Sequence, residues 1–190
     1  MGVKLRRSEQ SRICPGAALS RAVYRRIPEV KPDVQAEEEQ TMYTRIIVAV
    51  DSSHAANRAL DEAIKIAKDS AATLRIIHVL DDLSIYLVTN PYAGYYTGEL
   101  IENLRQEGKK ILEQAHARAA AAQVQVETVL YDDLGLPVEE RILTAAQDWP
   151  ADLIVMGTHG RRGMKRAMLG SSAEAVLRAS PIPVLLVRTP

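Results

Sequence analysis

The sequence predicts an α/β protein with a single doubly wound domain. Five short apolar runs alternate along the chain with segments whose apolar residues recur at helical spacing. The first run, Arg45–Asp51, is continuously apolar up to its final aspartate, as expected for a parallel strand covered on both faces. Alternating strands and helices imply right-handed crossovers, and therefore a parallel sheet with helices on both faces.

The first two strands enclose one amphipathic helix. Ser52 and Ser53 follow the first strand and can cap a helix whose apolar residues recur at helical spacing. These apolar residues are Ala56, Leu60, Ile64 and Ala67. A second strand is predicted over residues 73–80. Residues 81–98 are expected to form a long loop whose tyrosines pack onto the domain or a partner rather than stack on a ligand.

The remaining elements alternate to the end of the chain. They are a helix over residues 99–122, a strand over 124–131, a helix over 137–149, a strand over 153–156, a helix from Ser172 to about Ser180, and a strand over 183–187. A chain of 190 residues suits one domain with a tail, and its 47% hydrophobic content is enough for a sizeable core.

The loop before the last helix carries the most informative motif. Gly157-Thr158-His159-Gly160 follows a strand, and Gly170-Ser171-Ser172 comes after a further nine residues. Gly157 and Gly160 permit backbone angles and close approaches that a Cβ would block, and the second triplet sets free amides at a helix N-terminus. Such amides form a cradle for phosphate. Four cations in the loop could screen a polyphosphate, namely Arg161, Arg162, Lys165 and Arg166.

Each part of this motif also has an ordinary structural explanation. Glycine pairs mark turns, a serine before a helix is usually an N-cap, and a short basic run is usually a solvated face. Their combination on one strand-loop-helix unit favours anion binding. The sequence contains neither Gly-x-x-x-x-Gly-Lys-Ser/Thr nor Gly-x-Gly-x-x-Gly in this loop, which excludes a P-loop NTPase and an ordinary dinucleotide-binding fold.

The spacing Gly157-x2-Gly160-x9-Gly170-Ser171, preceded by Met156, resembles the universal stress protein family, specifically its ATP-binding branch. The resemblance extends from about Tyr43 to Arg188 and includes Asp51 at the end of the first strand. It implies the strand order 3-2-1-4-5, which periodicity cannot supply. With that order Asp51 faces the glycine loop at a topological switch point, where ligands bind in open α/β sheets.

The resemblance also implies a site for ATP, with Mg²⁺, and the residues that form it. The adenine pocket would be lined by backbone groups of Ala49, Val50 and Val79. Ribose and phosphates would be held by Met156, Gly157, Gly160, Gly170, Ser171 and Ser172. Core packing is the ordinary role of the apolar residues in this set, and both roles can hold because a backbone contact does not need the side chain.

Asp51 has two candidate roles. It can cap the following helix, or it can accept hydrogen bonds from ribose hydroxyls or hold a metal, because a carboxylate would repel phosphates. The matching family residues contact the nucleoside. His159 lies in the loop and could contact phosphate, although a lone loop histidine is more often solvated. The histidines show no ligand spacing such as His-Glu-x-x-His, so no protein metal site and no catalytic residue is assigned.

Charge and composition exclude several partners. The 24 basic and 24 acidic residues cancel to a formal charge of zero, so no global field would attract nucleic acid. No segment approaches the ~20 apolar residues of a membrane span. The single cysteine, Cys14, cannot form an internal disulfide, and the cytoplasm is the expected location.

Residues 1–42 are predicted to be a disordered N-terminal extension before the domain at residues 43–190. Met1–Ile27 contains seven Arg or Lys residues and one acid, and an acidic run follows at Glu37–Glu39. An Arg-rich, acid-poor start can be an organelle transit peptide, but serine enrichment and a clear amphipathic period are lacking. A disordered tail, or a natural start at Met42, is favoured.

The favoured function is a regulatory nucleotide-binding protein of the stress response, acting through conformation, dimer geometry or an unidentified protein partner, as the resemblance implies. A homodimer is expected because residues 181–187 would form an edge strand too apolar to stand exposed, and similar proteins pair through it. A slow ATPase or phosphoryl-transfer enzyme is the alternative, but no obvious general base accompanies the loop. A structural dimer without ligand is disfavoured by the intact glycine spacing.

Overall fold

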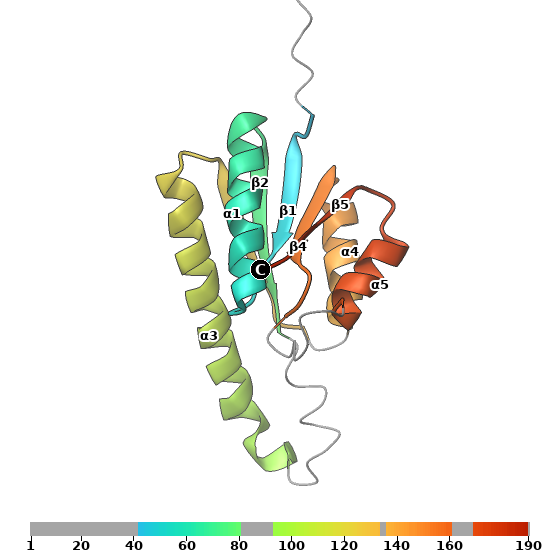
Figure 1. Ribbon diagram of the computed structural model, residues 1–190. Coiled ribbons are helices and arrows are strands. Elements are labelled where there is room, and N and C mark those ends of the chain that lie inside the picture. Colours follow the sequence, from blue (N-terminus) through green and yellow to red (C-terminus); the bar gives the residue numbers. More distant parts are fainter. Residues whose placement is uncertain (1–41, 81–92, 134–135, 161–168, 190) are drawn as a thin grey trace, which may run out of the picture. The chain divides into compact units, whose positions relative to one another are not determined.

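The computed structural model describes residues 42–80, 93–133, 136–160 and 169–189 (Figure 1). Strands and helices alternate in the order β1 (Arg45–Ala49), α1 (His54–Asp69), β2 (Thr73–Val79), α3 (Ala93–Ala121), β3 (Val126–Tyr131), α4 (Val138–Asp148), β4 (Leu153–Gly157), α5 (Ser171–Ala179) and β5 (Val184–Val187). The five strands form one parallel sheet in the order β3-β2-β1-β4-β5. The predicted fold class and strand order are confirmed.

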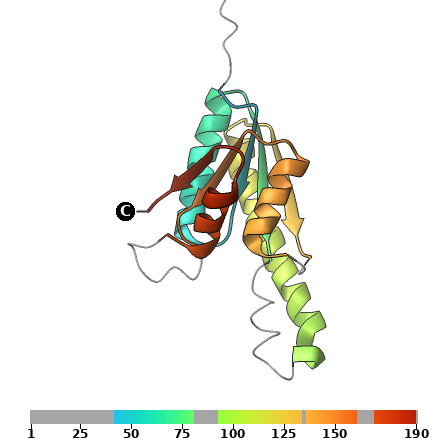
Figure 2. The ribbon, with the colours of Figure 1, turned by 90° about the vertical axis from the view of Figure 1, so that its right-hand side faces the viewer.

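Helices cover both faces of the sheet, α1 and α3 on one face and α4 and α5 on the other (Figures 1 and 2). Successive residues of β1 point to opposite faces. Ile46 and Val48 lie in the core beneath α1 and α3, whereas Ile47 lies in the core beneath α4 and α5. All three residues are at most 1% exposed. This burial on both faces explains the continuous apolar run in the sequence.

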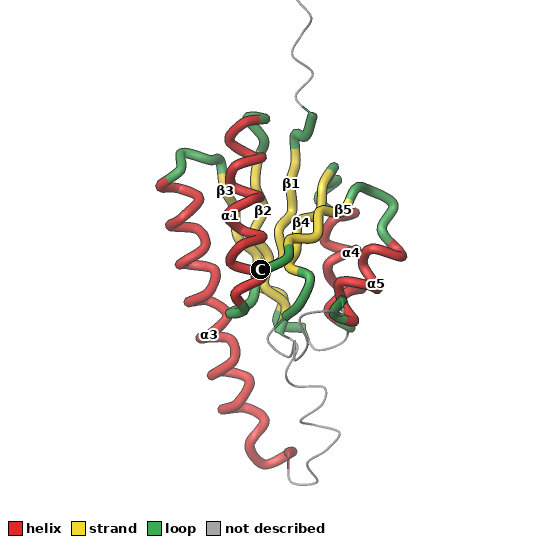
Figure 3. The backbone as a smooth tube through the Cα atoms, viewed as in Figure 1, coloured by secondary structure: helices red, strands yellow, loops and turns green. Residues whose placement is uncertain are grey.

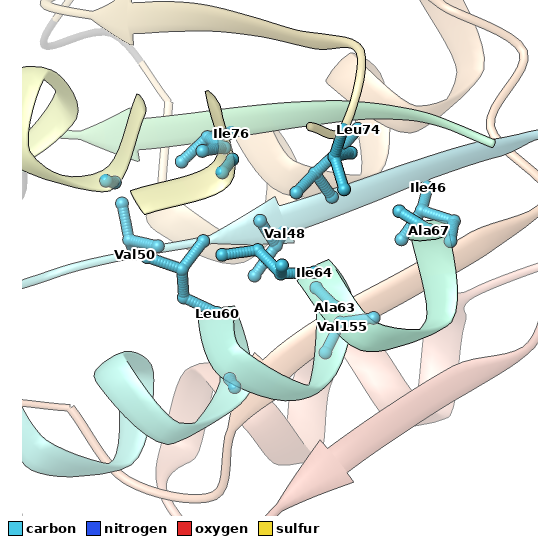
Figure 4. Packing of buried hydrophobic residues seen from close by; sticks show 14 of the residues in the cluster. Ile46, Val48, Val50, Leu60, Ala63, Ile64, Ala67, Leu74, Ile76 and Val155 are labelled. Atoms are coloured by element: carbon cyan, nitrogen blue, oxygen red, sulfur yellow. The ribbon is translucent and has the colours of Figure 1, made fainter. Parts of the chain in front are cut away.

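The core beneath α1 uses the helix face predicted from the sequence. Leu60 and Ile64 lie beside Val48 of β1 in this cluster (Figure 4). The second half of α3 completes the core, beginning near Leu112, because its first half extends beyond the carboxyl ends of the strands (Figures 1 and 2). Although α3 is 29 residues long, neither it nor any other described helix has the apolar length that a membrane crossing requires.

The boundaries of two elements differ from those predicted. The β1 strand ends at Ala49 rather than Asp51, and α3 begins at Ala93 rather than near Glu99. Part of the predicted long loop is therefore helical. Residues 93–98 contain two glycines and a β-branched threonine, which are weak helix formers, so the sequence pattern did not indicate a helix there. The rest of that loop, residues 81–92, and the predicted extension up to residue 41 lie outside the described residues.

Two helix-to-strand turns contain a residue with a left-handed backbone. Ala71 follows α1 with φ of 51°, and Gln123 follows α3 with φ of 62°. A side chain in this conformation brings its Cβ too close to the following carbonyl oxygen, which costs about 1–2 kcal/mol. Both turns therefore carry strain that glycine would relieve.

We predict that Ala71→Gly raises the free energy of unfolding by about 0.5–1 kcal/mol, because relief of strain exceeds the entropy that glycine adds to the unfolded chain. The matched control is Ala117→Gly, at an exposed position inside α3, which should lower the free energy of unfolding by about 0.5–1 kcal/mol. Urea unfolding followed by circular dichroism measures both. Equal losses in the two variants would contradict the strain at Ala71.

Candidate functional site

A pocket of about 270 Å³ lies at the carboxyl edge of the sheet. Because the strands are parallel, β1, β2 and β4 all end at this edge, and the loops after β1 and β4 lie next to one another there (Figure 3). The pocket is lined by all ten residues predicted for the site, namely Ala49, Val50, Asp51, Val79, Met156, Gly157, Gly160, Gly170, Ser171 and Ser172. The fold therefore brings together residues from three separate parts of the chain.

The N-terminus of α5 forms one wall of the pocket. Gly170 is the N-cap, and no side chain in the described part of the chain caps the helix. The Gly170 amide donates to the carbonyl of Thr158 at 2.9 Å, which ties the start of α5 to the end of β4. The residues of the first turn, Ser171 to Ala173, line the pocket. Uncapped amides at a helix N-terminus carry partial positive charge and can bind an anion.

Of the three glycines of the motif, Gly157 is the one that a close backbone approach requires, and none is required for an unusual backbone angle. None of them has a left-handed φ, contrary to the expectation for Gly157 and Gly160, and Gly170 has an ordinary extended φ of −65°. A Cβ on Gly157 would lie 2.8 Å from the backbone carbon of Ala55, so β4 can pass beneath the first turn of α1. A Cβ on Gly160 would lie 2.9 Å from Oδ2 of Asp51.

Asp51 stabilises the turn between β1 and α1. Its Oδ1 accepts a hydrogen bond from the Ser53 amide at 2.8 Å, while the N-cap itself is Ser53, whose Oγ accepts from the Ala56 amide at 3.1 Å. The expected capping role thus belongs to Ser53. The second carboxylate oxygen, Oδ2, lies on the side of Gly160 and the loop after β4. Asp51 can therefore support the local fold and still face a ligand.

Glu139 is a residue of this region that the sequence did not indicate. The hydroxyl of Ser172, in the first turn of α5, donates to Oε2 of Glu139, in the first turn of α4, at 3.1 Å. Ser172 therefore offers a ligand its amide more readily than its hydroxyl. Two neighbours of Glu139 on α4, Val138 and Ile142, line the pocket. No local signal could have identified them, because the position of α4 against α5 is a tertiary feature.

His159 is partly buried, whereas a lone loop histidine is more often solvated. Its Nδ1 lies 3.0 Å from Oγ1 of Thr158, and its Nε2 is buried and has no hydrogen-bond partner among the described residues. His159 lines the pocket together with Thr158 and His78, which the sequence did not assign to the site either. The predicted cations of the loop fall in residues 161–168, outside the described residues.

The comparisons of this chain with known protein families and known proteins agree with one another. The model of the Universal stress protein family matches residues 42–188. The universal stress protein YxiE of Bacillus subtilis (strain 168) is 37% identical over 153 residues, a match that covers 77% of this chain and 100% of YxiE.

Solved structures show the same relationship. A protein from the universal stress protein family of Burkholderia pseudomallei is 35% identical, with a TM-score of 0.63, over 78% of this chain and 98% of that chain. A universal stress protein solved in complex with cAMP is 29% identical, with a TM-score of 0.54, over 78% of this chain and 98% of that chain.

The close contact at Gly157 predicts that Gly157→Ala destabilises the fold by about 1–3 kcal/mol, since the new methyl group would overlap the backbone of α1. The control is Gly98→Ala in α3, where a Cβ would meet nothing within 4 Å, and where alanine should be neutral or stabilising. Thermal and urea unfolding of both variants test this. A Gly157→Ala protein as stable as Gly98→Ala would contradict the packing argument.

Proposed function

The chain belongs to the universal stress protein family, and we propose that it is an ATP-binding member whose bound nucleotide regulates its conformation or its partners. One observation carries the proposal. The N-terminus of α5, which no described side chain caps, faces a pocket whose other wall is formed by the ends of β1 and β2. This arrangement offers a site for phosphate beside a flat apolar site for a base. A relative solved in complex with cAMP supports an adenine nucleotide as the ligand.

Each part of the nucleotide has a matching part of the pocket. Adenine would lie against backbone groups of Ala49, Val50 and Val79, and the ribose hydroxyls would donate to Asp51, whose carboxylate can only accept. The phosphates would bind the amides that begin α5, from Ser171 on. The aligned helix dipole would add to these hydrogen bonds.

A magnesium ion would enter with the phosphates. Among the described residues no group of three or more His, Cys, Asp and Glu side chains could hold a metal ion. Asp51 lines the pocket, and Glu139 lies beside Ser172 at its phosphate side. These carboxylates would repel bare phosphates, and Mg²⁺, which binds through few protein carboxylates plus phosphate oxygens and water, would relieve the repulsion.

The geometry favours binding over hydrolysis. A fast ATPase needs a base or a positioned water at the γ-phosphate. Asp51 already accepts from the Ser53 amide, and Glu139 already accepts from the Ser172 hydroxyl. Both carboxylates thus have structural hydrogen bonds, which supports a regulatory role with at most slow turnover.

We predict that the protein binds MgATP and that Gly170→Val weakens this binding at least tenfold. A Cβ on Gly170 would lie 3.2 Å from the carbonyl of Thr158, so valine would displace the start of α5 and its amides, each of which gives a charge-assisted hydrogen bond of about 1.5–3 kcal/mol. Gly98→Val, in open space on α3, is the matched control and should bind as the wild type does. Isothermal titration calorimetry measures all three, with circular dichroism to confirm folding. Unchanged affinity in a folded Gly170→Val protein would show that the phosphates bind elsewhere.

The protein is further proposed to form a homodimer through β5, an edge strand of the sheet. The carbonyl of Pro183 accepts from the Ile154 amide of β4, and the carbonyl of Val187 accepts from the amide of Thr158, directly after β4. Because successive residues of a strand alternate in direction, the backbone groups of Val184 and Leu186 point away from β4. The first three residues of β5 are also partly exposed. An apolar edge with outward amides is suited to pairing with a second copy.

Light scattering at micromolar concentration should give twice the chain mass of 20.9 kDa. Leu186→Pro should shift the protein toward monomer, because proline removes an outward amide without removing a bond to β4. Leu186→Val keeps the amide and should remain dimeric. A monomeric wild type would contradict the proposal, and so would a Leu186→Pro protein that dimerises as tightly as Leu186→Val.

A further inference from the structure

The hydrogen-bond ladder between β1 and β2 ends at Val50. Thr73 donates to the carbonyl of Thr44 at 3.0 Å, and the Val50 amide donates to the carbonyl of Ile77 at 2.9 Å. In a parallel ladder the next bond would join the amide of Val79 to the carbonyl of Val50. Among the residues that the structure describes, no hydrogen bond joins these two groups.

The side chain of His78 forms a hydrogen bond with the carbonyl oxygen of Val50. Its Nδ1 lies 2.7 Å from that oxygen. A carbonyl oxygen can only accept, so this contact assigns the proton to Nδ1, which donates. His78 is 3% exposed and is the one buried polar side chain in the described part of the chain. A buried polar group that is placed to make such a bond has a definite structural role.

A notch in α3 holds the imidazole in this position. A Cβ on Gly108 would lie 2.8 Å from Cδ2 of His78 and 2.8 Å from Cδ1 of Leu130. Glycine inside a helix lowers helix stability relative to alanine, so this position keeps a residue that the helix itself disfavours. The gap that it leaves is filled by the ring. The ring is thus fixed from α3 and directed at the end of β1.

The backbone groups of Val79 are the ones that this hydrogen bond can make available to a ligand. Both backbone groups of a strand residue point to the same side, so the amide and carbonyl of Val79 point toward β1, at the edge where Val50, His78 and Val79 all line the pocket. Adenine presents an acceptor, N1, beside a donor, the N6 amino group, which match an amide and a carbonyl. Guanine presents a donor at N1 beside an acceptor at O6, which is the reverse pattern.

We propose that His78 is a positioning residue for base recognition: by binding the Val50 carbonyl through Nδ1, its imidazole holds that oxygen in place at the end of β1, which leaves the Val79 amide outside the ladder and available to adenine. The inference rests on the proposed function, since it concerns the base of the nucleotide in the same pocket. His78 thereby sets the preference for adenine over guanine without contacting the base itself. Without the imidazole, the Val79 amide closes the ladder onto Val50.

The test compares two substitutions at this position. His78→Leu keeps an apolar side chain in the notch but has no donor, whereas His78→Asn places an amide donor close to the position of Nδ1. Titration calorimetry with ATP and GTP should show that His78→Leu lowers ATP affinity about tenfold, the equivalent of one or two hydrogen bonds, and reduces the ratio of ATP to GTP affinity. His78→Asn should regain much of both quantities.

Amide hydrogen exchange provides a second readout that does not depend on affinity. In the nucleotide-free wild type the Val79 amide should exchange faster than the Ile77 amide, and in nucleotide-free His78→Leu it should become protected. A His78→Leu protein that folds, binds ATP as the wild type does and keeps the same ATP to GTP ratio would overturn the inference alone. A wild type that binds no adenine nucleotide would overturn the proposed function as well.

Discussion

The site depends on the parallel pairing of β1 with β4, because the chain leaves these neighbouring strands toward opposite faces of the sheet. β1 leads to α1 on one face, and β4 leads to α5 on the other. The two connections separate at the carboxyl edge, which is where open α/β sheets bind ligands. Gly157 makes the arrangement possible, since any side chain there would overlap the first turn of α1. The position of the end of β4 beneath α1 therefore depends on one close backbone contact.

The electrostatic character of the pocket comes from opposing groups held near one another. The start of α5 contributes amides that no side chain among the described residues caps, while Asp51 and Glu139 contribute carboxylates that are already hydrogen-bonded to the protein. Such a site suits a ligand with hydroxyls and an anionic group whose charge is shared with a cation. A magnesium nucleotide has all of these features. This match supports the proposal that the chain retains a nucleotide rather than hydrolysing it rapidly.

Much of what the pocket offers a ligand belongs to the main chain. Half of its lining residues are glycine, alanine or valine, whose side chains carry no polar atoms, so backbone amides and carbonyls contribute to recognition beside polar side chains such as Asp51. The availability of those groups is set by the hydrogen bonds of the sheet. Under the proposal for His78, a buried side chain changes what the pocket presents by binding one carbonyl at the end of the ladder.

The sequence by itself determined the order and type of the elements and the motif of the loop from Gly157 to Ser172, because periodicity, glycine spacing and helix capping act over a few neighbouring residues. The strand order came from the family resemblance carried by that motif. Only the tertiary structure decided that Glu139 lies beside Ser172 and that His78 reaches Val50. These contacts join segments that are far apart in the chain, and their geometry follows from how helices pack on the sheet, which no local pattern encodes.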